Sequence, residues 1–396
     1  MTSMIYLDNS ATTFVRDEVR QAMVPFQSDS FGNGSSIHQL GLRARLAIEK
    51  ARVAVANLLN AQPEEIFFTP CATYSNNVAL LGRARYVEEN GLGRHVITTP
   101  LEHSSALGPI QHLASRGWHV SYVNVDRDGL IDLNHLKSLL TYETSIISVM
   151  WGNNEIGSLQ PIAEIGSIAA QKGIYFHSDA VQVAGKLPLD VKAANVDTLS
   201  ISGHKFHAPK GIGALYIKKG AQILPIIFGG GQENGLFPGT ENVANIVGLG
   251  KAAEVAQAEM GSHSQRLERL QKILIDKLLR NPNIALTGPR DLAARVPGHV
   301  SVVIKGAGGP ELVEEIDSRG ICVSSVSACS SKSGHPSHVL KSIGYSADEA
   351  RGSLRITAGI LNTEEEVTRA AAILCEILAP KTVAPAFQQF HSALIA

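Results

Sequence analysis

An acid and a lysine follow two apolar runs of the sequence, in Phe176-His-Ser-Asp-Ala-Val-Gln182 and in Ser200-Ile-Ser-Gly-His-Lys-Phe-His207. Asp179 and Lys205 are separated by 26 positions (205 − 179). If both runs are parallel strands, their carboxyl ends lie at the edge of the sheet where α/β proteins hold ligands. A buried lysine is neutral more easily than an exposed one, and a neutral amine forms Schiff bases with carbonyl groups. A surface lysine and a helix-capping aspartate are the alternative that the spacing alone leaves open.

A candidate anion-binding turn lies in Phe67-Phe-Thr-Pro-Cys-Ala-Thr-Tyr-Ser-Asn-Asn77. An apolar run ends at Thr69, small residues follow, and a helical pattern resumes near Thr73. The backbone N–H groups of a helix N-terminus, together with a threonine hydroxyl, can bind a phosphate. Many turns between a strand and a helix carry threonine only as a cap, so a purely structural role stays open.

Cys329 lies in a run of small polar residues, Ser324-Ser-Val-Ser-Ala-Cys-Ser-Ser-Lys-Ser-Gly-His-Pro336. This composition predicts an accessible loop, which suits a reactive thiolate that must reach a partner. Cys322 and Cys375 stand in apolar stretches, so we expect them in the core. A metal site at Cys329 is not expected, because no second cluster of ligands occurs at zinc spacing.

The composition excludes several classes of function. The chain has 35 Lys and Arg against 36 Asp and Glu, a formal charge of −1, which argues against a broad nucleic-acid-binding face. No apolar run approaches the roughly 18 residues of a membrane span. The N-terminus lacks the cationic start and apolar stretch of a secretory signal, and four cysteines make no disulfide framework. We therefore expect free thiols in a reducing cytoplasm.

Alternating helical and strand patterns must position these residues. Buried strands are predicted at residues 66–69, 95–99, 120–125, 146–150, 174–177, 198–202 and 213–217, with helices such as 40–59 and 162–171 between them. This alternation predicts an α/β fold with a mainly parallel sheet covered by helices on both faces. A long helix near 242–279, strands near 300–304, 321–323 and 353–357, and a helix at 364–378 predict a smaller α+β domain.

A series of motifs runs nearly end to end along the chain. They are Tyr6-Leu-Asp-Asn-Ser-Ala-Thr-Thr13, Phe31-Gly-Asn-Gly-Ser-Ser-Ile-His38, Glu102-His103, Asn153-Asn-Glu-Ile-Gly157 with Gln160-Pro161, Asp179-Ala-Val-Gln182, Ser202-Gly-His-Lys205 with Pro209-Lys-Gly-Ile-Gly213, Gly239-Thr-Glu-Asn242, Ser327-Ala-Cys-Ser330 and Pro336-Ser-His-Val-Leu340. In content and order the chain resembles the cysteine desulfurases, pyridoxal 5'-phosphate (PLP) enzymes of fold-type I in the class V aminotransferase group.

The resemblance implies a large PLP-binding domain over residues 16–256, built on a mainly parallel seven-stranded sheet. It implies a small domain of residues 1–15 and 257–396 that carries the cysteine loop. Lys205 would hold PLP as a Schiff base, and Asp179 would bond the pyridine nitrogen so that the ring acts as an electron sink. Gln182 would bond the phenolic oxygen of the ring, and His103 would stack on it and move protons.

The resemblance also implies how phosphate and substrate are held. Ala72 and Thr73 at a helix N-terminus would bind the phosphate, with Ser202 and His204, and with Thr240 from a second subunit of a homodimer.

Two further residues would bind the carboxylate of free L-cysteine, namely Asn154, which would also contact the cofactor, and Arg355, whose bidentate guanidinium suits that group. A surface ion pair is the alternative for Arg355. The Cys329 thiolate would take the substrate sulfur as a persulfide, release alanine and pass the sulfur to an acceptor protein.

Three segments depart from the family pattern. The usual Ser-Gly-Gly/Ala-Thr-Glu of the phosphate turn is Pro70-Cys-Ala-Thr-Tyr74, so Cys71 replaces a glycine and is expected to crowd the cofactor or change the turn. Phe237 stands where the cross-subunit loop usually has arginine. Val326 replaces a glycine and is expected to stiffen the cysteine loop. These changes predict a specialised member of the family.

Two other functions remain open from the sequence. One is a PLP-dependent lyase that cleaves C–S or C–Se bonds without Cys329. The other is a degenerate paralogue that acts as an interaction scaffold through surfaces at Tyr74 and Phe237. The destination of the sulfur, such as iron–sulfur cluster assembly, tRNA thiolation or DNA phosphorothioation, is equally open, because the chemistry would be the same.

Overall fold

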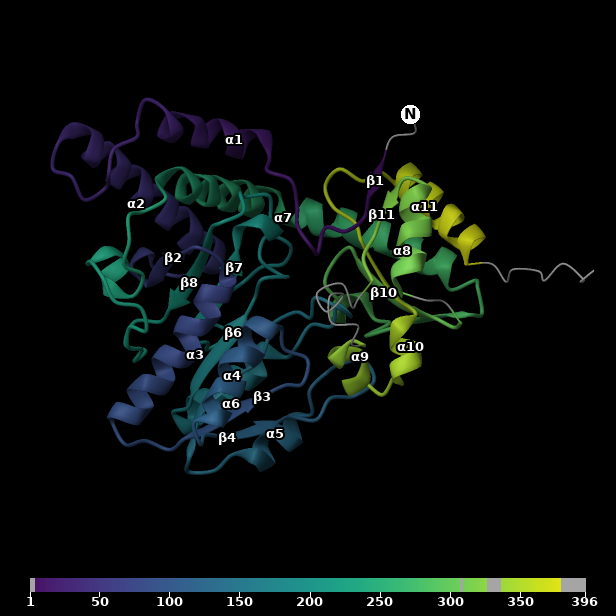
Figure 1. The fold of residues 1–396 in the computed structure, drawn as a ribbon, viewed down its shortest axis with the longest axis horizontal. Coiled ribbons are helices and arrows are strands. Elements are labelled where there is room, and N and C mark those ends of the chain that lie inside the picture. The colour runs from purple at the N-terminus through teal and green to yellow at the C-terminus, as the bar shows by residue number, and fades with distance from the viewer. Residues whose placement is uncertain (1–3, 307–308, 326–335, 379–396) are drawn as a thin grey trace, which may run out of the picture.

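The fold is known from a computed structural model that describes residues 4–306, 309–325 and 336–378. A seven-stranded sheet forms its larger part, in the strand order β2-β8-β7-β6-β5-β3-β4 (Figure 1). The strands are β2 (Ile66–Thr69), β3 (His95–Thr98), β4 (His119–Tyr122), β5 (Thr144–Ser148), β6 (Tyr175–Asp179), β7 (Thr198–Ser202) and β8 (Gly213–Ile217).

The pairing confirms a mainly parallel sheet, with one exception. β3, β4, β5, β6 and β7 pair in parallel, whereas β8 runs antiparallel to both β7 and β2. Only residues 203–212 join β7 to β8, and a connection this short cannot return the chain for a parallel strand.

β5 begins two residues before its apolar run. β5 starts at Thr144, whereas the run suggested residue 146. Thr144 and Ser145 are buried polar residues. The Thr144 Oγ1 lies 2.8 Å from His95 Nδ1 on the neighbouring strand β3, so the polar start of the strand is satisfied by hydrogen bonding inside the sheet.

Helices cover both faces of the sheet. The helices of the chain are α1 (Asp17–Met23), α2 (Gln39–Leu59), α3 (Ala72–Glu89), α4 (Ser104–Ser115), α5 (Leu133–Leu139), α6 (Ile162–Lys172), α7 (Val243–Leu278), α8 (Gly309–Ser318), α9 (His338–Ser342), α10 (Ala347–Arg351) and α11 (Glu364–Ile377). Alternate strand residues face opposite layers: Ile147 and Phe176 pack with α2 and α6, whereas Ile146 and Tyr175 pack with α3 and α4.

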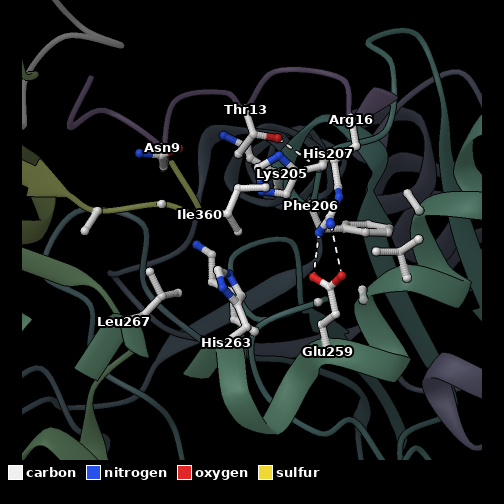
Figure 2. Close-up of a pocket in the computed structure, with 17 residues that line it drawn as sticks. Asn9, Thr13, Arg16, Lys205, Phe206, His207, Glu259, His263, Leu267 and Ile360 are labelled. Atoms are coloured by element: carbon white, nitrogen blue, oxygen red, sulfur yellow. Dashed lines mark hydrogen bonds and ion pairs between the residues drawn. The ribbon is translucent and has the colours of Figure 1, made fainter. Parts of the chain in front are cut away.

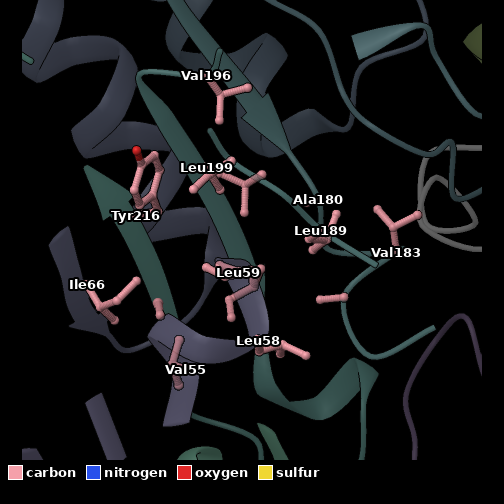
Figure 3. Packing of buried hydrophobic residues seen from close by; sticks show 14 of the residues in the cluster. Val55, Leu58, Leu59, Ile66, Ala180, Val183, Leu189, Val196, Leu199 and Tyr216 are labelled. Atoms are coloured by element: carbon pink, nitrogen blue, oxygen red, sulfur yellow. The ribbon is translucent and has the colours of Figure 1, made fainter. Parts of the chain in front are cut away.

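The largest core lies between α2 and the sheet (Figure 3). Val55, Leu58 and Leu59 of α2 pack among side chains of β2, β7 and β8, such as Leu199 and Tyr216. Leu59 is fully buried, and replacing such a leucine by alanine costs about 2–5 kcal/mol of stability. This packing anchors the strands whose carboxyl ends carry the site described below.

The smaller part contains the second core and two short sheets. β12 (Ser353–Thr357), β10 (His299–Ile304) and β9 (Ile284–Leu286) form an antiparallel three-stranded sheet, and β1 (Ile5–Tyr6) pairs in parallel with β11 (Ile321–Cys322). The 36-residue helix α7 extends from the first core to the second (Figure 1). The predicted domain boundary at residue 256 falls inside this unbroken helix, and the division into two domains stays a prediction.

Two cysteines differ from expectation. Cys322 and Cys375 were expected in the core, but both are half-buried. Cys322 ends the short strand β11, where its thiol lies 3.9 Å from Asp317 Oδ1, and Cys375 packs only against the margin of the second core. In the described part of the chain, no helix combines the length and the apolar character that a membrane span requires.

Candidate active site

The predicted site residues converge on one cavity at the carboxyl edge of the sheet. Its volume is about 360 Å³. The predicted residues that line it are Ala72, Thr73, His103, Asn154, Asp179, Gln182, Ser202, His204, Lys205 and Arg355. Of the other two, Thr240 lines a different pocket and Cys329 lies outside the described residues.

Strand ends and helix starts explain this convergence. Asp179 is the last residue of β6, and Ser202 is the last residue of β7, followed by the short 3-10 helix Gly203–Lys205. α3 begins at Ala72 after β2, and His103 is the N-cap of α4 after β3. Because most of these strands run in one direction, their ends meet at one edge of the sheet.

Asp179 is buried and held by two hydrogen bonds. Its Oδ2 accepts from Asn76 Nδ2 at 2.8 Å, and its Oδ1 accepts from the Val181 backbone N–H at 3.0 Å. The Oδ1 of Asn76 lies 3.0 Å from His177 Nε2. This network orients the carboxylate toward the cavity, and the sequence alone did not identify Asn76 as part of it.

His103 faces the cavity with a defined tautomer. Its Nδ1 accepts from the Ser105 backbone N–H at 3.1 Å and lies 2.8 Å from Ser105 Oγ. A neutral ring in this position therefore carries its proton on Nε2. Burial lowers the pKa of His103, although the nearby Asp179 opposes this shift. At neutral pH the imidazole is uncharged. Its Nδ1 can accept a proton once it no longer accepts the hydrogen bond from Ser105.

The N-terminal segment covers the lysine. Lys205 Nζ donates to the Ser10 carbonyl at 2.6 Å and to the Ala11 carbonyl at 2.9 Å. The same segment is fixed to the base of the site, because the Thr13 backbone N–H donates to the His204 carbonyl at 2.9 Å. Ser10 and Ala11 also line the cavity. They belong to the first motif of the sequence, but their spacing gave no signal for a contact with Lys205.

Arg355 is buried, not a surface ion pair. Its side chain is 6% exposed, and Nη2 pairs with Asp8 Oδ1 at 2.9 Å while Nη1 donates to the Asn154 carbonyl at 3.0 Å. Its Nε has no hydrogen-bond partner among the described residues. A guanidinium held in this way can still offer a donor to an anionic ligand in the cavity.

The predicted phosphate turn forms without strain at Cys71. Cys71 is the N-cap of α3 with φ −173°, an extended conformation open to any residue, so the turn does not require the glycine that the family usually has there. The Cys71 side chain makes no capping hydrogen bond and lines the cavity. Cys71 therefore fits the turn without strain, and the expectation that it crowds the cofactor or changes the turn stays a prediction.

Thr240 and Phe237 lie apart from the cavity. They line an apolar pocket of about 280 Å³ together with Tyr74. Phe237 is buried in a small core with Val78 and Leu215, so it does not form the exposed binding surface that the scaffold interpretation required. Tyr74 is about half exposed, at 48%.

Comparison with known proteins identifies the family. The Aminotransferase class-V family pattern matches residues 5–370. The chain is 43% identical over 379 residues to "Cysteine desulfurase IscS" of Clostridium botulinum, covering 96% of this chain and 95% of that protein. It is 44% identical to the protein of the same name from Methanosarcina thermophila, covering 94% and 92% of the two chains. The chain belongs to the cysteine desulfurase family.

Solved structures of related proteins have the same fold. A "NifS-like protein" superposes with a TM-score of 0.88 at 39% identity, over 95% of this chain and 99% of that one. The structure titled "SspA in complex with cysteine" superposes with a TM-score of 0.79 at 37% identity, over 89% and 98% of the two chains. The fold-type I α/β architecture expected of a desulfurase is thereby confirmed.

Cys329 and Val326 fall in the segment 326–335, outside the described residues of this desulfurase. The residues on either side of that segment contact the site. Ser325 lines the cavity, and His338 Nε2 lies 3.1 Å from the Glu102 carbonyl oxygen. Cys329, the predicted sulfur carrier, thus lies in the sequence between Ser325 and His338, two residues that contact the site.

Two buried acids of the desulfurase were missed by sequence reasoning. Glu102 is fully buried, and burial raises its pKa to about 8. Its Oε1 accepts from Thr99 Oγ1 at 2.9 Å and from the Met150 backbone N–H at 2.8 Å, whereas Oε2 has no partner among the described residues. Burial also raises the pKa of Glu155, which accepts a hydrogen bond from Ser337 Oγ. Both acids support the wall that carries His103 and His338.

Proposed function

We propose that this chain is a PLP-dependent cysteine desulfurase that converts L-cysteine to L-alanine and carries the sulfur as a persulfide on Cys329. The net reaction balances: the C–S bond of the substrate breaks, an S–S bond forms on the enzyme thiol, and hydrogen replaces sulfur on the β-carbon. The observation that carries the proposal is the convergence of Lys205, Asp179, His103 and Arg355 on one cavity. The relative crystallised "in complex with cysteine" supports the substrate.

The polar atoms of the cavity fit the cofactor. Three residues that line it carry a buried polar atom without a partner among the described residues, namely Ser10 Oγ, Gln182 Oε1 and Arg355 Nε. Such groups are rare in proteins without a ligand or water to satisfy them. Lys205 would link covalently to the aldehyde, and Asp179 would pair with the pyridine nitrogen. When bound, the cofactor supplies an electron sink for the charge left on the substrate α-carbon.

The phosphate would lie at the N-terminus of α3. Ala72 and Thr73 begin this 18-residue helix, whose unpaired N–H groups favour an anion. Ser202 and His204 line the same cavity. Burial lowers the pKa of His204 to about 4, so a neutral imidazole would donate a hydrogen bond there and not a full charge.

His103, Arg355 and Cys329 would each carry out a different part of the reaction. His103, neutral and in contact with the cavity, would take the proton from the substrate α-carbon and return protons to the product. Arg355 would bind the substrate carboxylate with the donors that Asp8 leaves available. Cys329 would attack the substrate sulfur as a thiolate, because the thiolate is the nucleophilic form.

The proposal also includes the partners of the chain and its cellular compartment. Thr240 does not line the cavity of its own chain, which is consistent with a role in a second subunit of a homodimer. The persulfide would be taken by an acceptor protein, and we keep the expectation of a cytoplasmic enzyme.

Turnover of the purified holoenzyme with L-cysteine tests the function. With a reductant present, we expect alanine and sulfide in equal amounts, and a persulfide on Cys329 detectable by mass spectrometry after trapping. Cys329→Ser is expected to abolish alanine formation while it retains the yellow cofactor absorbance. Continued alanine formation by this variant would instead support the lyase, and a wild-type protein that binds no PLP would support the scaffold.

A further inference from the structure

A second cavity, drawn in Figure 2, also has Lys205 in its wall. His207 and Arg16 line one side, and Glu259, His263 and Leu267 of α7 line the other. Of the residues that line the active-site cavity, only Lys205 is shared. The cavity has a volume of about 30 Å³, which is room for about two water molecules.

Lys186 brings an unbalanced positive charge to this cavity. Its side chain lines the cavity and is buried, with 8% of the residue exposed. No hydrogen bond or ion pair joins its Nζ to a described residue. A buried ammonium without a neighbouring anion is disfavoured, because the few water molecules that fit beside it solvate the charge less than bulk water does.

The surrounding charges do not compensate Lys186. The titratable and charged groups around it and its cavity come from the N-terminal segment, the residues after β7, α7, β10 and β12. They are Arg16, Lys205, His207, Glu259, His263, Arg266, His299 and Arg355. Glu259 is the acid among them, and Arg16 already binds it through two hydrogen bonds of 2.6 and 3.0 Å. Arg16 also pairs with Glu18 at 3.5 Å, so both nearby acids serve Arg16 and neither pairs with Lys186.

The two histidines of the cavity have ring nitrogens that can form further hydrogen bonds. His207 Nδ1 lies 3.1 Å from the Phe14 carbonyl and donates to it, so its Nε2 remains available. The ring of His263 makes no hydrogen bond with a described residue. Burial lowers the pKa of both rings to about 4, so both are neutral near pH 7. His263 can then donate from one ring nitrogen, whereas His207 already donates from Nδ1 and its Nε2 can only accept.

We propose that this cavity binds one small monovalent anion of chloride size, held by the Lys186 ammonium and by His263. The small volume excludes sulfate and phosphate, which also carry more charge than the site supplies. A water molecule in the same place would solvate Lys186 but would leave its charge unbalanced.

Binding of the anion is linked to a proton. Burial lowers the pKa of Lys186 to about 7, and the neighbouring Lys205 and Arg355 add to this shift. A bound anion favours the ammonium and raises this pKa again. The anion therefore binds most tightly below about pH 7, and its affinity falls by up to about tenfold for each pH unit above that value.

The site would also join the two parts of the fold. α7 supplies Glu259, His263 and Leu267, and residues 358–360 of the smaller part complete the wall. Asn9 and Thr13 come from the segment whose Ser10 carbonyl binds Lys205 Nζ. An anion here stabilises the closed arrangement of these elements around the lysine.

Crystallography with bromide tests the site directly. Crystals of the holoenzyme are soaked in sodium bromide, and anomalous scattering is measured at the bromine edge. We expect a peak within hydrogen-bonding distance of Lys186 Nζ in the wild type and none in Lys186→Met. Bromide peaks confined to the outer surface, or a water at this place, would overturn the proposal.

Thermal unfolding provides the test in solution. At equal ionic strength, chloride is expected to raise the melting temperature above that in gluconate, whose anion is too large to enter, and to do so more at about pH 6 than at about pH 8.5. Lys186→Met is expected to lose this difference, whereas the exposed Lys192→Met keeps it. If Lys186→Met does not fold, the wild-type comparison still decides, because equal melting temperatures in the two salts contradict the site. None of these measurements depends on turnover.

Discussion

Arg355 and Asp8 form a buried ion pair of 2.9 Å between residues 347 positions apart in the chain. The pair joins β12 to the N-terminal segment at the wall of the active-site cavity. Asp8 orients the guanidinium and also neutralises part of its charge. The substrate carboxylate would therefore meet an arginine whose direction is set but whose donors are partly occupied.

The first prediction concerns Arg355. Arg355→Lys keeps the charge but loses the planar pair of donors, so we expect the KM for L-cysteine to rise about tenfold or more with a smaller change in kcat. Steady-state alanine production measures both constants. Asp8→Asn, which keeps a hydrogen bond to Arg355, is the matched variant and is expected to change KM less. An unchanged KM in Arg355→Lys would remove Arg355 from the substrate site.

The second prediction concerns Lys205. Lys205→Ala is expected to lose the yellow absorbance of the lysine-linked cofactor and to reduce alanine formation to background, because the amine that links the cofactor is removed. Absorbance spectra of the purified variant, read beside the exposed Lys172→Ala as control, make the measurement. A Lys205→Ala spectrum identical to the wild type would mean that another lysine holds the cofactor.

The third prediction follows from burial of Glu102. Its pKa is raised from 4.5 to about 8, so the folded state favours the protonated acid. The resulting stability is fully present below about pH 4.5 and is lost as the pH rises toward 8. Glu102→Gln cannot ionise, and we expect its melting temperature to decline less than that of the wild type between these pH values. The exposed Glu64→Gln should follow the wild type; parallel curves for Glu102→Gln would show that this acid does not titrate there.

The fourth prediction concerns the packing of the phosphate turn. A Cβ at Gly213 would lie 2.7 Å from the Ile201 carbonyl oxygen and 3.2 Å from the Ala72 backbone nitrogen. Gly213→Ala is expected to cost about 1–3 kcal/mol of stability and to weaken PLP retention, because it displaces the start of α3. Gly108→Ala in α4, where nothing lies within 4 Å, is the control and should be neutral or stabilising. Equal PLP retention in both variants would contradict this link.

The fifth prediction separates two effects of Cys71. Because its backbone is extended, Cys71→Gly relieves no strain in the turn, and we expect PLP affinity within about threefold of the wild type, less than 1 kcal/mol. Equilibrium titration of the apoenzyme with PLP gives the value. A large gain in affinity would mean that the thiol, which lines the cavity, crowds the cofactor.

Much of this protein is encoded in local patterns of the sequence. Strands β2, β7 and β8 begin and end at the predicted residues, and all of their residues are buried. β2 and β8 are mostly apolar, as expected of strands covered on both faces, whereas β7 alternates Leu199 and Ile201 with buried Thr and Ser residues. Asp179 and Lys205 could be assigned to one edge of the sheet for the same reason: each follows a strand end, and parallel strand ends coincide.

The tertiary structure alone decided the contacts that adjust this chemistry. Asn76 holds Asp179 from 103 positions away, and Asp8 holds Arg355. The exposure of Lys186 also depends on three-dimensional packing, since the chain segments that enclose it are distant in sequence. Neither helical nor strand periodicity carries information about such pairs, because they depend on how separate elements dock. The sequence thus determined the fold class and the reactive groups, and long-range packing determined their orientation, burial and charge.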